Sequence, residues 1–167
     1  MFADEKFAIA FHSCRTCSSL AAFTSQTKNL KAAAGGGAVA AAGAAAATAE
    51  SSLPDDCPAD VETLGRSTWT LLHSMAATYP ERPTAAEQAD LRTFMGTFSR
   101  LYPCWVCAED LQAYMRREQL RVGGRDEFGR WLCEAHNAVN RKLGKPNFDC
   151  DTWEERWRTG WKDGRCG

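Results

Sequence analysis

Apolar residues after position 60 recur with the 3.6-residue period of an α-helix, and this pattern limits the fold more than any other property of the sequence. Prolines, capping residues and glycines interrupt the pattern every few turns. They predict helices over 61–79, 84–102, 104–118 and 126–143, and a short fifth helix that begins at Asp151 or Thr152. No run of alternating β-branched residues competes with these helices. The sequence therefore predicts an all-α fold, a four-helix bundle with a short fifth helix.

Single residues mark the predicted helix ends. Thr84 is a suitable N-cap for the second helix and Asp126 for the fourth. Pro103 ends the second helix, and Gly144 closes the fourth. In the first helix we expect Leu64, Leu71, Leu72 and Met75 to form the core face.

The stretch from Ala32 to Glu50 consists almost entirely of Ala and Gly. It has no large side chain that could anchor a core, and its glycines interrupt any helix that the alanines favour, so we predict a flexible linker over 32–55. The linker separates an N-terminal arm, residues 1–31, from a folded domain over 56–167.

Charge and hydropathy exclude two classes of function. The chain has 20 basic and 21 acidic residues, so no basic excess favours binding of nucleic acid. No apolar stretch reaches the ~18 to 20 residues of a membrane span. The first ten residues include Asp4 and Glu5 with one lysine, which is typical of neither a signal peptide nor a transit peptide, and we expect no cleavable targeting segment.

Eight cysteines include two CxxC pairs, Cys14 with Cys17 and Cys104 with Cys107. Pro103 places the second pair in the first turn of a helix, where exposed N–H groups stabilise a thiolate and favour thiol–disulfide exchange. Half of a zinc site and an inert structural disulfide have the same spacing and stay open as alternatives. A thioredoxin-like fold is disfavoured, since the pair follows no predicted strand.

Three lines of polar and aromatic residues lie on the predicted helices. The first helix carries Gly65, Trp69, His73 and Ala77 at intervals of four, with Arg66 beside them, which suits a flat heteroaromatic ligand.

The fourth helix carries the second line, Cys133, His136, Asn137 and Asn140, which faces either solvent or a polar ligand. Lys142 and Lys145 follow it and could bind phosphate. The third line is Trp153, Trp157 and Trp161, with Arg156 and Arg158 between them. Tryptophans at this spacing are more often packing residues than cofactor ligands.

Three stretches together resemble the Erv and augmenter-of-liver-regeneration family of FAD-linked sulfhydryl oxidases. They are GRSTW with LH at 65–73, YPCWVCAEDL at 102–111, and CEAHNAVNRKLGKPNFDC at 133–150. The resemblance covers about 56–167, and the arm with Cys14 and Cys17 also resembles the family's N-terminal shuttle segment.

The resemblance implies a helical bundle that binds FAD beside the disulfide of Cys104 and Cys107. Cys104 would receive the incoming thiolate, and Cys107 would lie nearest the flavin. The residues that would line the cofactor are Gly65, Arg66, Trp69, His73, Tyr102, His136, Asn137, Asn140, Lys142, Lys145, Arg156 and Trp157.

The same resemblance implies a role for every other cysteine. Cys133 and Cys150 would form a structural disulfide, and Cys57 with Cys166 would link the subunits of a homodimer. Cys14 and Cys17 would carry electrons to Cys104 and Cys107, and the flavin would pass them to O2 or cytochrome c. The resemblance implies that the protein is located in the mitochondrial intermembrane space. Its implied dithiol substrate is the import oxidoreductase of that compartment.

Two readings without oxidase activity compete with this one. The two CxxC pairs could supply four thiolates to zinc in a binding module, although the long linker between them argues against it. A disulfide-stapled, growth-factor-like signalling protein is the other reading, and its activity would survive loss of Cys104 or Cys107.

Overall fold

The structure of the protein is a computed structural model that describes residues 57–166. The predicted arm, the predicted linker and Cys14 and Cys17 lie outside the described residues. The elements are α2 (Val61–Thr78), α3 (Ala85–Leu101), α4 (Trp105–Arg117) and α5 (Arg125–Lys142), followed by a 3-10 turn, η2 (Cys150–Thr152), and a π-helical turn, η3 (Glu155–Thr159). Residues 57–166 contain no strand, so the all-α prediction is confirmed.

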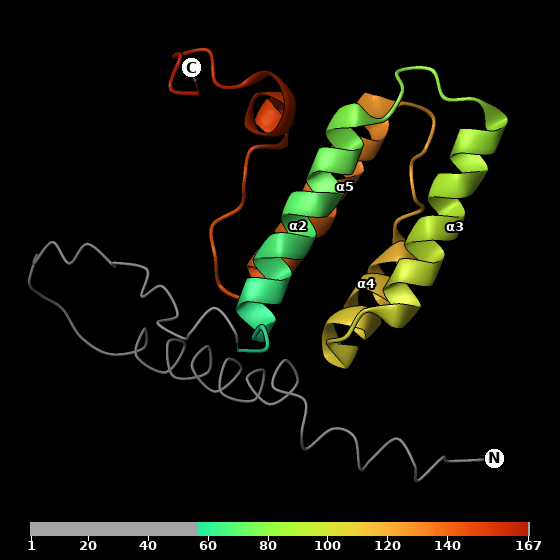
Figure 1. Cartoon of the computed structure of the whole chain (residues 1–167), viewed down its shortest axis with the longest axis vertical. Helices are drawn as coiled ribbons and strands as arrows, with labels where there is room; N and C mark the ends of the chain where they lie inside the picture. Colours follow the sequence, from blue (N-terminus) through green and yellow to red (C-terminus); the bar gives the residue numbers. More distant parts are fainter. Residues whose placement is uncertain (1–56, 167) are drawn as a thin grey trace, which may run out of the picture. The chain divides into compact units, whose positions relative to one another are not determined.

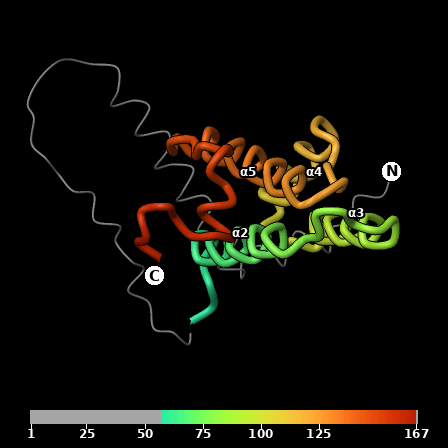
Figure 2. The backbone as a smooth tube through the Cα atoms, turned by 90° about the horizontal axis from the view of Figure 1, so that it is seen from above, coloured from blue at the N-terminus to red at the C-terminus, as the bar shows by residue number. Residues whose placement is uncertain are grey.

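The four helices form two layers. Figure 1 shows the helices and their connections, and in Figure 2 α2 and α3 lie in one layer while α4 and α5 lie in the other. Side-chain bonds join the layers: Gln112 of α4 donates to the carbonyl of Ser99 in α3 at 2.9 Å, and His73 of α2 meets His136 of α5.

Local sequence explains both ends of α3. Thr84 and Glu87 form a capping box, in which each side chain bonds the other residue's backbone N–H, a motif that stabilises a helix by about 1 kcal/mol. At the other end Tyr102 is extended because Pro103 disfavours helical geometry in the residue before it. The predicted cap and the predicted end are therefore both confirmed.

Two predicted caps are wrong. The helix α5 begins at Arg125 with Gly124 as its N-cap, and Asp126 lies in the first turn. The Asp126 carboxylate instead binds Arg130 and the indole of Trp153. The cap of the short fifth helix is Asp149, whose side chain accepts from the N–H of Asp151, and neither Asp151 nor Thr152 has this role.

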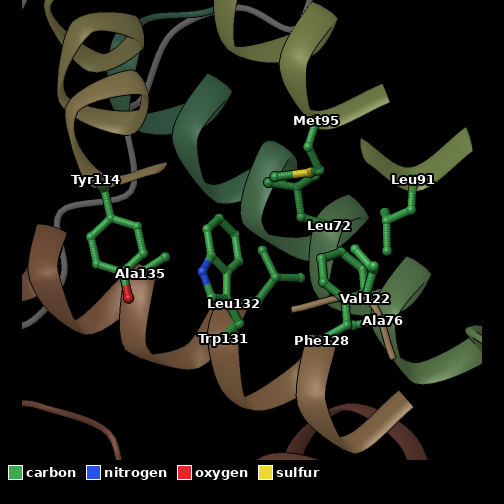
Figure 3. Close-up of a cluster of buried hydrophobic side chains, with 10 residues drawn as sticks. All are labelled: Leu72, Ala76, Leu91, Met95, Tyr114, Val122, Phe128, Trp131, Leu132 and Ala135. Carbon is green, nitrogen blue, oxygen red and sulfur yellow. The ribbon is translucent and has the colours of Figure 1, made fainter. Parts of the chain in front are cut away.

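The main core lies between the two layers. Figure 3 shows its buried side chains, among them Leu72, Met95 and Trp131, and each large apolar side chain that is fully buried contributes about 1.5–3 kcal/mol. One predicted core residue is wrong, because Leu71 is 54% exposed. The buried face of α2 carries Leu72, His73, Ala76 and Ala77, and Leu71 lies beside that face.

Among the helices of residues 57–166, none is both long enough and apolar enough to cross a membrane.

Candidate active site

A disulfide joins Cys104 and Cys107 at the start of α4. Cys104 is the N-cap, and its carbonyl accepts the N–H of Ala108 at 2.8 Å. Cys107 is the third residue of the helix, so both cysteines lie within the first turn, as the sequence predicts. The free N–H groups and the dipole at a helix start favour an anion, so they favour the thiolates that opening of this disulfide releases.

The two cysteines differ in exposure. Cys104 is 1% exposed, whereas Cys107 is only half-buried. An incoming thiolate must reach the sulfur that it attacks. In this structure the exposure of the pair favours Cys107 as the accessible sulfur, and the assignment of Cys104 to the incoming thiolate stays a prediction.

Four flat rings from three elements lie together in two stacked pairs. Trp69 of α2 stacks on His136 of α5 with ring centroids 4.1 Å apart and planes 4° from parallel. His73 of α2 stacks on Trp157 of η3 at 4.5 Å and 6°. These residues belong to all three lines found in the sequence, and we call them the aromatic cluster.

The two histidines of the aromatic cluster meet directly. Nε2 of His73 lies 3.2 Å from Nδ1 of His136, so one ring donates a hydrogen bond to the other. Burial, with the positive charges of His136 and Arg156, lowers the pKa of His73 to about 3. Burial, with the charge of Lys145, lowers the pKa of His136 to about 4. Both imidazoles are therefore neutral at pH 7.

One polar atom in the aromatic cluster is buried without a partner. His73 is 2% exposed, and its Nδ1 has no hydrogen-bond partner among the described residues. A buried polar group left unpaired costs about 1–3 kcal/mol. A ligand that hydrogen-bonds at this atom would remove that cost.

Two predicted cations lie close to the aromatic cluster. The guanidinium of Arg156 lies over the ring of Trp157 at 4.4 Å from its centroid. Lys145 is near enough to His136 to lower the pKa of that imidazole. The cluster can therefore bind a flat heteroaromatic group with anionic substituents.

Tyr102 connects the disulfide with the aromatic cluster. It lies two residues before Cys104, and its hydroxyl lies near the side chain of Thr68, the neighbour of Trp69 in α2. Burial raises the pKa of Tyr102, so its hydroxyl stays protonated. Gly65, one turn before Trp69, has no atom within 4 Å of the position that a Cβ would take.

The side chain of Asn137 hydrogen-bonds to other residues of the chain. Its amide nitrogen donates to the carbonyl of Phe148 at 2.8 Å, and its oxygen accepts the N–H of Phe148 at 2.8 Å and the amide of Asn140 at 3.3 Å. A disulfide joins Cys133 and Cys150 beside these bonds. Asn137 and this disulfide hold the segment after α5 against the helix.

Two other predicted ligands form ion pairs on the surface. Arg66 pairs with Glu62 one turn earlier in α2 at 2.9 Å. Lys142 pairs with Asp110 of α4. The structure does not place either of them in the aromatic cluster.

Several residues that contact the predicted site residues or their neighbours were not identified from the sequence. Asp110 and Thr68 contact predicted ligands from other helices, and Gly129 makes room for the ring of Trp153. A glycine inside a predicted helix was the one signal that could have indicated Gly129, because glycine is unfavourable there by about 1 kcal/mol.

The remaining cysteines do not form a disulfide within the described chain. Cys57 is a half-buried free thiol, and Cys166 is an exposed free thiol. Within residues 57–166, no group of three or more His, Cys, Asp or Glu residues could hold a metal ion.

Comparisons with known proteins agree on one family. The sequence profile of the Erv1 / Alr family matches residues 66–158. The chain is 54% identical over 106 residues to the mitochondrial FAD-linked sulfhydryl oxidase ERV1 of Saccharomyces cerevisiae, a match that covers 64% of this chain and 56% of that protein. It is 50% identical over 99 residues to the corresponding oxidase of Schizosaccharomyces pombe, covering 58% of this chain and 54% of the relative. The chain therefore spans only slightly more than half the length of these relatives.

Solved structures give the same result. The crystal structure of the yeast Erv1 core matches with a TM-score of 0.64 and 49% identity, over 70% of this chain and 99% of the other. The FAD-binding domain of Erv1 from Saccharomyces cerevisiae matches with a TM-score of 0.61 and 53% identity, over 63% of this chain and 100% of that one. With its helical bundle, its disulfide at a helix start and its aromatic cluster, the chain belongs to the Erv1/Alr family.

Proposed function

We propose that this protein is an FAD-dependent thiol oxidase that makes disulfides in a protein substrate. The observation that carries the proposal is the link through Tyr102, which follows α3, precedes the disulfide by two residues and has its hydroxyl near the side chain of Thr68, next to Trp69. This link connects a disulfide that can exchange with a dithiol to a cluster that can bind a flat redox cofactor.

The aromatic cluster fits FAD. The unpaired Nδ1 of His73 offers a hydrogen-bonding position, the stacked rings offer flat surfaces, and Arg156 and Lys145 offer positive charge to phosphates. The residues proposed to hold FAD are Trp69, His73, His136, Arg156 and Trp157, with Gly65, Arg66, Tyr102, Asn137, Asn140, Lys142 and Lys145 around them. Asn137 would act by holding the segment after α5, and Lys142 could act only if its pair with Asp110 opened.

The chain's own chemistry is thiol–disulfide exchange. A substrate thiolate attacks one sulfur of the Cys104–Cys107 disulfide, forms a mixed disulfide and releases the other sulfur as a thiolate. The second substrate thiolate then attacks the substrate sulfur of that mixed disulfide. The substrate leaves with a new disulfide, and Cys104 and Cys107 remain as a dithiol that holds the two electrons. When bound, FAD supplies the two-electron oxidant that restores the disulfide, with O2 or cytochrome c as final acceptor.

The N-terminal arm would deliver the electrons. Its Cys14–Cys17 pair would oxidise the substrate dithiol and then be reoxidised by Cys104 and Cys107. As the predicted flexible linker, the roughly 40 residues between Cys17 and Cys57 would have an r.m.s. reach of roughly 35 Å, on a scaling of 5–6 Å times the square root of length. That reach allows transfer within a chain or across a dimer.

The proposed assembly is a homodimer linked through Cys57 and Cys166. The exposure of Cys166 and the free thiol of Cys57 support this link, because both sulfurs are available for bonding to a second copy. Electrophoresis without reductant should show a covalent dimer, and Cys57→Ser or Cys166→Ser should abolish it.

The proposed location is the mitochondrial intermembrane space, where the import oxidoreductase would be the dithiol substrate. The similarity to the mitochondrial oxidases of two yeasts supports a mitochondrial location.

Oxygen uptake with a small dithiol tests the proposed activity. The FAD-loaded chain should consume O2 when dithiothreitol is added, and the Cys104→Ser and Cys107→Ser variants should not. Oxygen uptake that survives both substitutions would contradict the proposed role of this disulfide. No oxygen uptake by the unmodified, FAD-loaded chain would contradict the proposed activity and favour an interaction protein without oxidase activity.

A further inference from the structure

Trp153, one helical turn before Trp157, is held apart from the aromatic cluster. It is 1% exposed, and its indole Nε1 donates to Oδ1 of Asp126 at 3.1 Å. Asp126 lies in the first turn of α5, so this bond ties the C-terminal segment to the opposite end of α5 from Asn137.

The ring of Trp153 lies against Gly129. A Cβ at position 129 would lie 2.6 Å from each of three atoms of the six-membered ring, a distance that real contacts do not reach. Glycine inside a helix is less stable than alanine by roughly 0.5–1 kcal/mol. The room that Gly129 leaves for the ring compensates for this cost.

Ion pairs hold the acceptor of this indole in place. The Nε of Arg130 lies 3.0 and 3.1 Å from the two oxygens of Asp126, and its Nη1 binds Asp151 at 2.6 Å. We call Asp126, Gly129 and Arg130 the Trp153 seat.

A continuous helical segment connects Trp153 with the proposed cofactor site. Residues 153–159 are helical without interruption, so the position of Trp153 determines the position of Trp157 one turn later. Trp157 stacks on His73 at 4.5 Å, and Arg156 lies over Trp157.

We propose that the Trp153 seat positions the cofactor site, because it sets where Trp157 and Arg156 lie against His73. Asp126 and Gly129 are positioning residues, which act through Trp153 and do not contact the cofactor. This inference rests on the proposed function, since it requires that the aromatic cluster binds FAD.

Titration of the full chain with FAD, followed by the change in flavin fluorescence, tests the inference. Gly129→Ala pushes the Trp153 ring from its place and should weaken FAD binding about tenfold, or roughly 1.4 kcal/mol. Gly96→Ala is the matched control, because the nearest atom to its new Cβ is a guanidinium nitrogen of Arg100 at 3.8 Å. FAD affinity of this control should be unchanged.

A second substitution separates positioning from a general loss of stability. Trp153→Phe removes the ring atoms that the new Cβ would meet, and it also removes the N–H that donates to Asp126. Trp153→Phe should therefore weaken FAD binding by itself, and adding Gly129→Ala to it should cost less affinity than adding Gly129→Ala to the unmodified chain. Leu91→Ala, in the core of α3, should lower thermal stability and leave FAD affinity unchanged.

The Asp126 variants decide the question if Gly129→Ala does not fold. Asp126→Asn keeps an oxygen that can accept from Trp153, whereas Asp126→Ala does not. We expect weaker FAD binding in the alanine variant than in the asparagine variant.

The outcomes distinguish the two proposals. If the unmodified chain does not bind FAD, the proposed function fails and the inference fails with it. If the unmodified chain binds FAD and Gly129→Ala or Asp126→Ala binds it equally well, the positioning role alone is wrong. Equal weakening by Leu91→Ala, or a loss of affinity from Gly129→Ala that is the same with and without Trp153→Phe, also overturns it.

Discussion

His73 and His136 come from different helices and approach each other to 3.2 Å between Nε2 and Nδ1. Two imidazolium ions could not share this contact, since each would present only donors. The contact therefore requires that at least one ring is neutral, and the lowered pKa values make both rings neutral at pH 7.

The first prediction concerns acid stability. The pKa is lowered from 6.5 to about 3 for His73 and to about 4 for His136, so between about pH 4 and 6.5 the unfolded chain binds protons that the folded chain does not. The free energy of unfolding should fall as the pH drops from 7 to 5, by up to about 1.4 kcal/mol per pH unit for each histidine.

Urea denaturation at pH 7 and pH 5 measures this effect. His73→Phe keeps an aromatic ring but removes a titrating group, so its stability should depend less steeply on pH. The same dependence in the variant and the unmodified chain would show that His73 does not titrate in this way.

The second prediction concerns the Cys133–Cys150 disulfide. It closes a loop with a sequence separation of 17, and loops of this length are stabilised by roughly 3 kcal/mol. Replacing both cysteines by serine should lower the free energy of unfolding by about that amount, measured by urea denaturation without reductant. An unchanged free energy would mean that Asn137 holds the segment without the disulfide.

The third prediction concerns the order of attack within the active disulfide. The family resemblance implies that Cys104 receives the incoming thiolate, although Cys104 is buried and Cys107 is only half-buried. When a small disulfide is added, the Cys107→Ser variant should therefore form a mixed disulfide and release a small thiolate more readily than Cys104→Ser does, as detected by mass spectrometry. The reverse result would assign the attack to Cys107, as the exposures favour.

The fourth prediction concerns the arm. Cys14→Ser should slow oxidation of a protein dithiol substrate, because that substrate relies on the Cys14–Cys17 pair for electron transfer. Oxidation of dithiothreitol should be unchanged, since a small dithiol reaches the Cys104–Cys107 disulfide directly. Comparing the two rates in one preparation provides the test, and equal loss of both would remove the shuttle role.

Local signals predicted much of the fold. The capping box of Thr84 and Glu87 lies within four residues, and the effect of Pro103 on Tyr102 lies between neighbours. Interactions of such short range can be identified from sequence alone. The placement of Cys104 and Cys107 in the first turn of α4 followed from the same signals.

Long-range contacts account for the failures. Asp126 was predicted to cap a helix, but its carboxylate binds the indole of Trp153, 27 residues away. Leu71 was predicted to be buried because it is apolar, but its position around the helix axis leaves it outside the contact face of α2. Local spacing in the sequence identifies neither the distant partner of Asp126 nor the face of α2 that contacts the core.

In the candidate site, too, local patterns could be predicted from the sequence and long-range contacts could not. The three lines of aromatic and polar residues were visible in the sequence, and the structure brings Trp69, His73, His136 and Trp157 together. The ion pair of Lys142 depends on Asp110 in a different helix, so local spacing could not indicate that this lysine is paired away from the aromatic cluster.

The visible absorption spectrum of the purified full chain, recorded without oxygen during titration with dithiothreitol, tests the central claim most directly. We predict the spectrum of an oxidised flavin at one FAD per chain, which bleaches as the dithiol is added. The Cys104→Ser and Cys107→Ser variants should bind flavin and resist bleaching. A colourless chain that contains stoichiometric zinc, or a bound flavin that bleaches equally in both variants, would contradict the proposal.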